Sequence, residues 1–386
     1  MLVIALAEVL QVTGSLLLQI TRWLKQHGDA VLDLDATFVR CAGLEATSDR
    51  TYSWLWYWHG VTELPALMPN LRHLSLTCEK NLMVAEQDLS SLQILTHLQT
   101  LRLNMASNGR WDYETMSPLQ HLTALKRLDS WVKGLSTMFL APGLGKLTLL
   151  TSLSLRQPWS FKSASTYDSE RAGDVLGHLT SLQELTLQCL VDRIPPAFSH
   201  LQHLRTLTVS GVGEAWPAFS VQPSFSACRN LKYLRLFNFT AVAGAGWSEA
   251  WSALSALPAL SDISLERVDL EALQGNGWAF GNILTLLSIV YCDLVEFPEA
   301  LVSLTSLQSL SFDRTDLGNL SELPAGPYLE QLTSLDLSNT ALASFPAALS
   351  QASKLKRLIA FEDPSWLGLD ELEAILPDRC VLEVKA

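Results

Sequence analysis

The residues of this chain that could do chemistry are scattered singly along it. The six cysteines show no CxxC pair and no His/Cys cluster at zinc-ligand spacing. No P-loop, GxSxG elbow, HExxH or EF-hand pattern occurs. We therefore predict that the chain is not an enzyme and has no catalytic residues, no metal ligands and no cofactor. The cysteines are Cys41, Cys78, Cys189, Cys228, Cys292 and Cys380.

Several of the eight histidines directly precede a leucine of a recurring motif, among them His97, His121, His178, His200 and His203. No metal-type spacing accompanies them, so we interpret them as polar positions of a repeat. Acidic pairs such as Glu362-Asp363 and Asp370-Glu371 are interpreted as a solvated face.

Arginine and aromatic side chains alternate with leucines in several short segments. Trp, Tyr and Arg dominate the binding energy of protein interfaces, and aromatic rings on an exposed strand reduce solubility. We predict that these side chains bind a protein partner. The alternative is that long insertions fold over them and bury the rings. The candidate residues are Arg102, Arg127, Trp131, Arg156, Tyr233, Arg235 and Phe237.

The elements that position these side chains are marked by an LxxLxL motif. It occurs in twelve copies between residues 71 and 360, at steps of 22 to 32 residues, from Leu71/Leu74/Leu76 to Leu355/Leu358/Ala360. The last two apolar positions of each copy are two residues apart, so in a strand they point to the same face. A short strand cannot bury that face alone, and stacked copies form a parallel sheet with a continuous apolar ladder behind it.

The second half of each copy must return the chain to the next strand. Residues 294–301 and 342–349 each combine an apolar anchor, a proline and a short helical turn. LTxL segments such as Leu122-Thr-Ala-Leu125 then lead into the next strand.

The motif and its period resemble the leucine-rich repeat. The resemblance implies an α/β solenoid, a right-handed β-α superhelix shaped as a horseshoe, with the sheet inside and short helices outside. The asparagine ladder of that family is largely missing. Its position holds Ala106, Leu190, Val212, Phe239 and Val268 in the middle copies, then Cys292, Thr315 and Thr340. We therefore expect irregular turns first and regular turns from about residue 284, where polar substitutes begin.

Residues 1–60 do not fit the repeat, and we predict two regions: an N-terminal cap, 1–60, and a solenoid of about twelve repeats with a C-terminal cap, 61–386. Helical spacing over residues 15–27 predicts a capping helix that stops at Gly28. Trp23 to Gly28 followed by Val31 to Leu34 also resembles the segment after the F-box in F-box/leucine-rich-repeat proteins, although no F-box precedes it.

Two further features could extend a binding surface. Trp54, Trp56 and Trp58 form a stripe that we interpret as covering the cap core rather than as a ligand platform. Long loops at 157–175, 211–230 and 240–251 are either variable filler or extensions of the binding face.

Charge and targeting signals limit the partners and the compartment. The net charge is −12, with 16 Lys and Arg against 18 Asp and Glu in residues 1–193, and 11 against 21 thereafter. An acidic surface repels phosphate, so we expect no nucleic-acid partner. The apolar N-terminus has no basic region and is interrupted by Glu8, so we expect no signal peptide and no membrane segment. Single cysteines favour a reducing compartment.

We therefore predict a monomeric cytoplasmic scaffold that binds a protein partner. The F-box resemblance implies substrate recognition in a ubiquitin-ligase-type pathway. The alternative is an extracellular or immune-type receptor fragment that senses a peptide or glycan. Disulfides, a processed N-terminus, or glycans at the sequons of Asn238 and Asn319 would favour that alternative.

Overall fold

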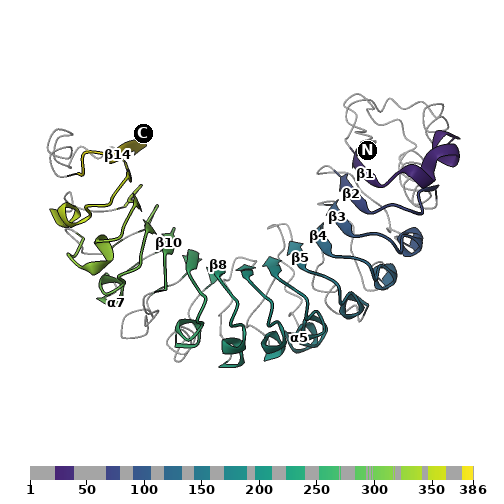
Figure 1. The fold of residues 1–386 in the computed structure, drawn as a ribbon, viewed down its shortest axis with the longest axis horizontal. Coiled ribbons are helices and arrows are strands. Elements are labelled where there is room, and N and C mark those ends of the chain that lie inside the picture. The colour runs from purple at the N-terminus through teal and green to yellow at the C-terminus, as the bar shows by residue number, and fades with distance from the viewer. Residues whose placement is uncertain are drawn as a thin grey trace, which may run out of the picture. The chain divides into compact units, whose positions relative to one another are not determined.

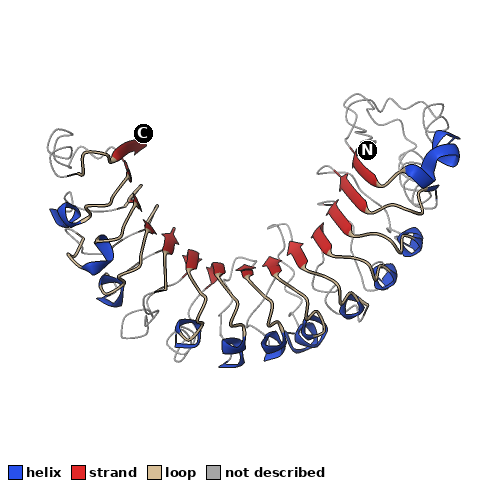
Figure 2. Ribbon diagram, in the orientation of Figure 1, coloured by secondary structure: helices blue, strands red, loops and turns tan. Residues whose placement is uncertain are grey.

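The computed structural model describes residues 22–38, 67–78, 90–105, 117–132, 143–156, 169–188, 196–210, 223–239, 252–268, 270, 283–292, 294, 297, 299–315, 317, 323–340, 347–361 and 376–385. The chain forms two compact units, Met1–Leu190 and Val191–Ala386. In each unit the described strands line one side and the helical segments line the other (Figure 2).

The first unit holds six parallel strands in chain order (Figure 1). They are β1 (Asp33–Phe38), β2 (His73–Cys78), β3 (Thr100–Met105), β4 (Arg127–Val132), β5 (Ser152–Arg156) and β6 (Glu184–Gln188). On the other side lie the 3₁₀ helices η1 (Gly28–Ala30), η3 (Ser90–Ile94), η4 (Ser117–His121) and η5 (Leu144–Lys146), and the α-helix α5 (Ser169–Gly177).

The second unit continues the same plan with eight parallel strands in chain order. They are β7 (Thr206–Ser210), β8 (Tyr233–Phe239), β9 (Asp262–Val268), β10 (Leu286–Val290), β11 (Ser309–Ser311), β12 (Ser334–Asp336), β13 (Arg357–Phe361) and β14 (Val381–Lys385). Its helical segments are η6 (Pro196–His200), η7 (Pro223–Ala227), α7 (Glu299–Val302), η9 (Pro327–Leu329) and η10 (Ala347–Gln351), with a helical turn at residues 252–255.

The predicted repeat is confirmed: each of the twelve LxxLxL copies forms one strand, β2 to β13. In β5 the inward Leu153 and Leu155 are 1% and 0% exposed, and their neighbours are half-buried. Burying a leucine side chain contributes about 1.5–3 kcal/mol, so the stacked ladder supplies most of the stabilisation of each strand. The fold is the predicted α/β solenoid.

A tight turn joins each helical segment to the next strand. In the LTxL segment of η4 and β4, the amide of Leu125 donates to the carbonyl of Leu122 at 2.9 Å, and both leucines are fully buried. The same bond joins Leu182 to Leu179 at 3.0 Å. The motif therefore turns the chain while both of its leucines stay in the core.

The predicted return segment at 294–301 is also confirmed. Leu294 and Phe297 are buried, and α7 follows directly. The ring of Phe297 lies 5.9 Å from the rings of both Phe312 and Tyr328, so this anchor joins adjacent repeats.

Most of the outer elements are 3₁₀ helices of three to five residues rather than α-helices. The α-helix α5, at residues 169–177 of the first unit, overlaps the end of the segment predicted as a long loop, 157–175. The described residues do not include 157–168 of that predicted loop, the predicted loop at 240–251 or the stripe of Trp54, Trp56 and Trp58.

Turns at the ends of the strands become regular earlier than predicted. Five non-glycine residues with positive φ, between 50° and 60°, stand two positions after the last inward residue of five successive copies. They are Asn238, Arg267, Tyr291, Arg314 and Asn339. The regular turn is therefore already present at β8, two repeats before residue 284, although Phe239 and Val268 occupy the ladder position in β8 and β9. Ala106, Leu190 and Val212 lie outside the described residues.

The polar substitutes bond to the backbone, as predicted. Thr315 Oγ1 donates to the Ile289 carbonyl at 2.8 Å. Cys292 Sγ accepts from the Val268 amide at 3.4 Å and lies 3.9 Å from the Leu265 carbonyl. Each side chain thus ties its turn to the preceding repeat. Val268, which cannot do so itself, is buried and supplies the amide that Cys292 accepts from.

The N-terminal described segment joins the first unit directly. Residues 22–27 are helical, Leu24 is 2% exposed, and β1 pairs in register with β2. The sequence predicts that the helix stops at Gly28, but Gly28 does not have the left-handed conformation typical of a glycine that stops a helix. A Cβ at Gly28 would lie 1.7 Å from the Leu67 carbonyl oxygen, so close packing requires the glycine. The boundary proposed between residues 60 and 61 falls outside the described residues.

Candidate functional site

The described residues hold no group of three His, Cys, Asp or Glu side chains that could bind a metal ion. The five histidines singled out by the sequence are all exposed, at the ends of 3₁₀ helices or on turns, and each precedes a buried leucine. A shallow, open depression of about 400 Å³ lies in the first unit beside β1 to β3. Its lining is Asp29, Leu32, Asn70, Arg72, His97, Gln99 and Ala124, which include no serine, threonine or cysteine nucleophile.

In the first unit, a carboxylate on β4 bridges two arginines. Arg156 Nη2 on β5 donates to Asp129 Oδ1 at 2.8 Å and to Oδ2 at 3.0 Å. Arg102 Nε on β3 lies 3.2 Å from Asp129 Oδ2. Because these side chains are 25–62% exposed, each ion pair contributes little stability, about 0–1 kcal/mol. The main effect of the bridge is to fix two guanidinium groups in place on the strand face.

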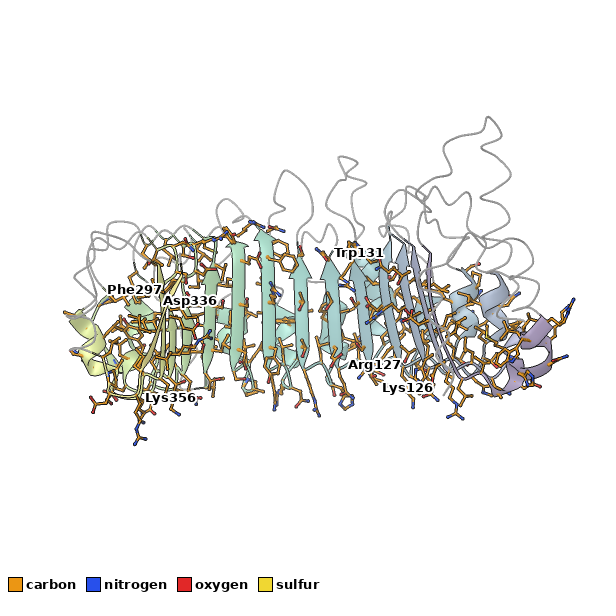
Figure 3. The ribbon with its side chains drawn as sticks, turned by 90° about the horizontal axis from the view of Figure 1, so that it is seen from above. Lys126, Arg127, Trp131, Phe297, Asp336 and Lys356 are labelled. Carbon is orange, nitrogen blue, oxygen red and sulfur yellow. The ribbon has the colours of Figure 1, made fainter. Side chains whose placement is uncertain are left out.

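Trp131 stands next to this bridge. It is half-buried and in register with Asn104 on β3 and with Arg156 on β5. Arg127 is exposed at the start of β4, and Figure 3 shows it near the opposite end of that strand from Trp131. The four predicted residues of this unit therefore share one face of three adjacent strands, with one carboxylate among three cations.

In the second unit, β8 carries the other three predicted residues. Tyr233 is 51% exposed. Arg235 Nη2 donates to Glu266 Oε2 on β9 at 2.8 Å, and its guanidinium carbon lies 5.4 Å from the centre of the Phe237 ring. Phe237 is half-buried, so the aromatic rings of this face remain partly accessible among the described residues.

The aromatic-arginine cluster extends to side chains outside the predicted set. Arg267 and Arg314 place their guanidinium carbons 4.6 Å and 5.1 Å from the centre of the Tyr291 ring. Arg314 also donates to the Tyr291 hydroxyl, and Arg267 lies 3.9 Å from Glu266. Cation–π contacts of this kind contribute about 0.5–1 kcal/mol at exposed sites.

Arg267, Tyr291 and Arg314 all occupy the left-handed turn positions described above. A left-handed conformation costs a non-glycine residue about 1–3 kcal/mol, and these three residues adopt it with φ between 50° and 53°. The sequence signal that could have found Arg267 is its place two residues after the last inward leucine, the same place that holds Tyr291 and Arg314. The period-2 pattern also puts the bridging carboxylates Asp129 and Glu266 at outward strand positions, but the predicted set does not include them.

The predicted residues thus form two groups, one on each unit. Arg102, Arg127, Trp131 and Arg156 lie together on β3 to β5, and Tyr233, Arg235 and Phe237 lie together on β8. No helix of the described residues is long and apolar enough to span a bilayer.

Comparisons with known proteins find the fold but no sequence relative. No family model matches the chain, and no curated protein matches it. An internalin from Listeria monocytogenes superposes with a TM-score of 0.59 at 16% identity, covering 96% of this chain and 94% of the internalin.

A leucine-rich-repeat protein from Leptospira interrogans gives a TM-score of 0.46 at 16% identity, with 91% and 89% of the two chains covered. The leucine-rich-repeat ectodomain of a plant membrane receptor kinase from Arabidopsis thaliana gives 0.47 at 15% identity. That match covers 87% of this chain, which spans 37% of the receptor chain. The superposition with the internalin shows that the two chains share their fold.

Proposed function

We propose that this chain, whose fold is a leucine-rich-repeat solenoid, is an interaction scaffold that binds a protein partner on the strand face. The observation that carries the proposal is the pair of arginine-aromatic clusters around Trp131 and Tyr233. In these clusters Arg156 and Arg235 are held by ion pairs on stacked strands, and Arg235 also contacts the Phe237 ring, so these side chains lose little conformational freedom when a partner binds. Exposed Trp, Tyr and Arg are the residue types that dominate interfaces.

The test is affinity purification from the native cell extract with wild type and a Trp131→Ala/Tyr233→Ala/Phe237→Ala variant. We expect a specific partner to be retained by wild type and lost by the variant. A matched control removes three apolar side chains that are 37–53% exposed elsewhere, Ile94→Ala/Leu149→Ala/Ile283→Ala. Circular dichroism checks that all three proteins fold.

Equal retention of the partner by wild type and the first variant would contradict this assignment of the binding face. Loss in the control alone would place the interface away from the strand face. Single substitutions at Trp131 and at Tyr233 then separate the contributions of the two units.

We also propose that the scaffold acts in a reducing compartment such as the cytoplasm. In support, Cys228 is a free, buried thiol whose Sγ donates to the Phe198 carbonyl at 3.2 Å, and Cys292 is also buried. Asn238, the acceptor of one of the two glycosylation sequons, is 3% exposed. Equal masses for the protein purified from its native cells with and without reduction of disulfides, and with no attached glycan, would support this compartment.

The finer proposal is substrate recognition in a ubiquitin-ligase-type pathway. Its support is the segment that resembles the one after an F-box, in which Leu24, Val31 and Leu34 are buried at 2–6% exposure. The captured partner should then carry more ubiquitin in cells that express wild type than in cells that express the Trp131→Ala/Tyr233→Ala/Phe237→Ala variant. Equal ubiquitin on the partner in the two kinds of cells would contradict a role in ubiquitin-dependent substrate recognition.

A further inference from the structure

Two adjacent repeats of the second unit form a basic patch in an acidic chain. The described residues of these repeats, 196–210 and 223–239, include four Arg or Lys side chains and no Asp or Glu. Residues 194–386 as a whole carry 11 basic against 21 acidic side chains. The four cations are Arg205, Arg229, Lys232 and Arg235, and all are exposed.

Backbone hydrogen bonds bring two of these cations, Arg205 and Lys232, side by side. The Arg205 carbonyl accepts from the Lys232 amide at 2.9 Å and from the Tyr233 amide at 3.0 Å. Arg205 and Lys232 therefore occupy the same repeat position on neighbouring strands, about 4.8 Å apart. Figure 3 shows Lys126 and Lys356, which hold this position in other copies, at the edge of the sheet where their strands begin.

Only one of the four cations has a carboxylate partner among the described residues. Arg235 pairs with Glu266, whereas Arg205, Arg229 and Lys232 have no acidic group within 4.0 Å there. Unpaired like charges closer than the Debye length of about 8 Å add their potentials. The patch therefore attracts an anion that can reach several of these side chains at once.

The surroundings of the patch limit what that anion can be. The next strand, β9, presents Asp262 and Glu266, so a long polyanion such as a nucleic acid would meet carboxylates one repeat away. Tyr233, 51% exposed at the start of β8, adds an aromatic surface beside the cations. This combination fits a short acidic stretch of a protein, with carboxylates at the patch and an apolar side chain on Tyr233.

We infer that an acidic segment of the partner docks on β7 and β8 of the second unit, on the patch of Arg205, Arg229, Lys232 and Arg235. The inference rests on the proposed protein-binding function, because it names the chemistry of the partner. It adds Arg205, Arg229 and Lys232, at the strand-start edge, to the residues of the strand face.

The test measures binding of a fluorescein-labelled peptide of alternating glutamate and leucine to the full chain by fluorescence anisotropy. The comparison probes are a peptide of alternating lysine and leucine, a single-stranded oligothymidine and vesicles of phosphatidylcholine with phosphatidylserine. We expect the glutamate peptide to bind and the lysine peptide not to bind. Raising the salt from roughly 0.05 to 0.3 M should weaken binding at least about tenfold.

The variant Arg205→Glu/Arg229→Glu/Lys232→Glu should lose at least about tenfold in affinity for the glutamate peptide. The matched control reverses three other exposed cations of the same unit, Lys354→Glu/Lys356→Glu/Arg379→Glu, and changes the net charge equally. It should keep most of the affinity. Circular dichroism verifies both folds.

Tighter binding of the oligothymidine or the vesicles than of the peptide overturns the inference, as does an equal loss in both variants. Failure of this inference can be distinguished from failure of the proposed function. If the extract partner is retained by the Arg205→Glu/Arg229→Glu/Lys232→Glu variant but lost by the Trp131→Ala/Tyr233→Ala/Phe237→Ala variant, the scaffold stands and the acidic segment does not.

Discussion

At the scale of single residues, the side chains of the candidate site owe their positions to partners that sequence alone does not reveal. The period-2 pattern placed Arg156 and Arg102 on the outward face, and it also placed Asp129 between them. It could not show that one carboxylate holds both guanidinium groups, because the rotamers of long side chains depend on the stacking of the strands. The same holds for Arg267 and Arg314 on the ring of Tyr291.

Gly28 illustrates how a correct residue can be given the wrong reason. Its place after a helical segment suggested a left-handed stop, and the structure instead shows a backbone contact with Leu67. That contact joins segments about 40 residues apart, so no local pattern encodes it.

Replacing Gly28 by alanine should therefore destabilise the fold. The added Cβ would overlap the Leu67 carbonyl oxygen, which as a backbone atom cannot move without shifting its segment. Overpacking of this kind costs about 1–3 kcal/mol in the free energy of unfolding, measured by urea titration.

The control for this prediction is Gly145→Ala. The nearest atom to a Cβ there, the Val175 carbonyl oxygen, would lie 3.5 Å away, an ordinary contact. Gly145→Ala should be neutral or slightly stabilising. Equal effects of the two substitutions would contradict the role assigned to Gly28.

At the scale of elements, the strands were predictable and the outer segments were less so. The LxxLxL motif marks each strand because two inward leucines fix both its location and its facing. Outer segments such as η4 and η6 need only cover the ladder, and a 3₁₀ turn or an α-helix such as α5 can do so. Sequence therefore gives their place but not their type.

The turns after the strands are held by different side chains in different copies, and the conformation is shared nonetheless. Phe239 fills its turn by burial, whereas Thr315 holds its turn by a hydrogen bond to Ile289. The prediction of irregular turns around Phe239 and Val268 was wrong because it counted only polar side chains and left out apolar filling and bonds from the next repeat.

Thr315→Val should lower the stability of this turn. Valine keeps the shape of threonine but cannot donate to the buried Ile289 carbonyl, which should cost about 1–2 kcal/mol in a urea titration. Thr333→Val is the control, since its hydroxyl donates to the Gln308 carbonyl at the exposed edge. The control should change stability by less than about 0.5 kcal/mol. A smaller loss of stability for Thr315→Val than for Thr333→Val would contradict the role assigned to the Thr315 hydroxyl in holding the turn.

At the scale of the whole molecule, stability in a solenoid comes from contacts between neighbouring repeats. The number of repeats and the parallel chain order of the strands followed from the period of the motif. The division into two compact units at Leu190 did not, because the motif continues on both sides of it. Local exposure differs along the second unit: Val381 and Val384 on β14 are 58% and 45% exposed, whereas the inward residues of β8 are buried.

Thiol alkylation should report this difference. Burial raises the pKa of the Cys228 thiol to about 12, so at pH 8 only about one molecule in ten thousand carries the reactive thiolate. Cys380, beside β14, is half-buried. We expect iodoacetamide to modify Cys380 in the native protein well before Cys228, as measured by peptide mass spectrometry. Equal rates in denaturant serve as the control, and faster native modification of Cys228 would contradict the packing around it.

The spacing of the strands also differs from the spacing of side chains along an extended peptide. Equivalent positions recur about every 4.8 Å from strand to strand, while the alternate side chains of an extended peptide recur about every 6.6 Å. The two scales coincide only after about three or four strands. A fully extended partner segment that lies across either unit can therefore match the aromatic rings of the strand face only at every third or fourth strand. The repeats between those strands contact the partner through flexible arginine and lysine side chains or not at all.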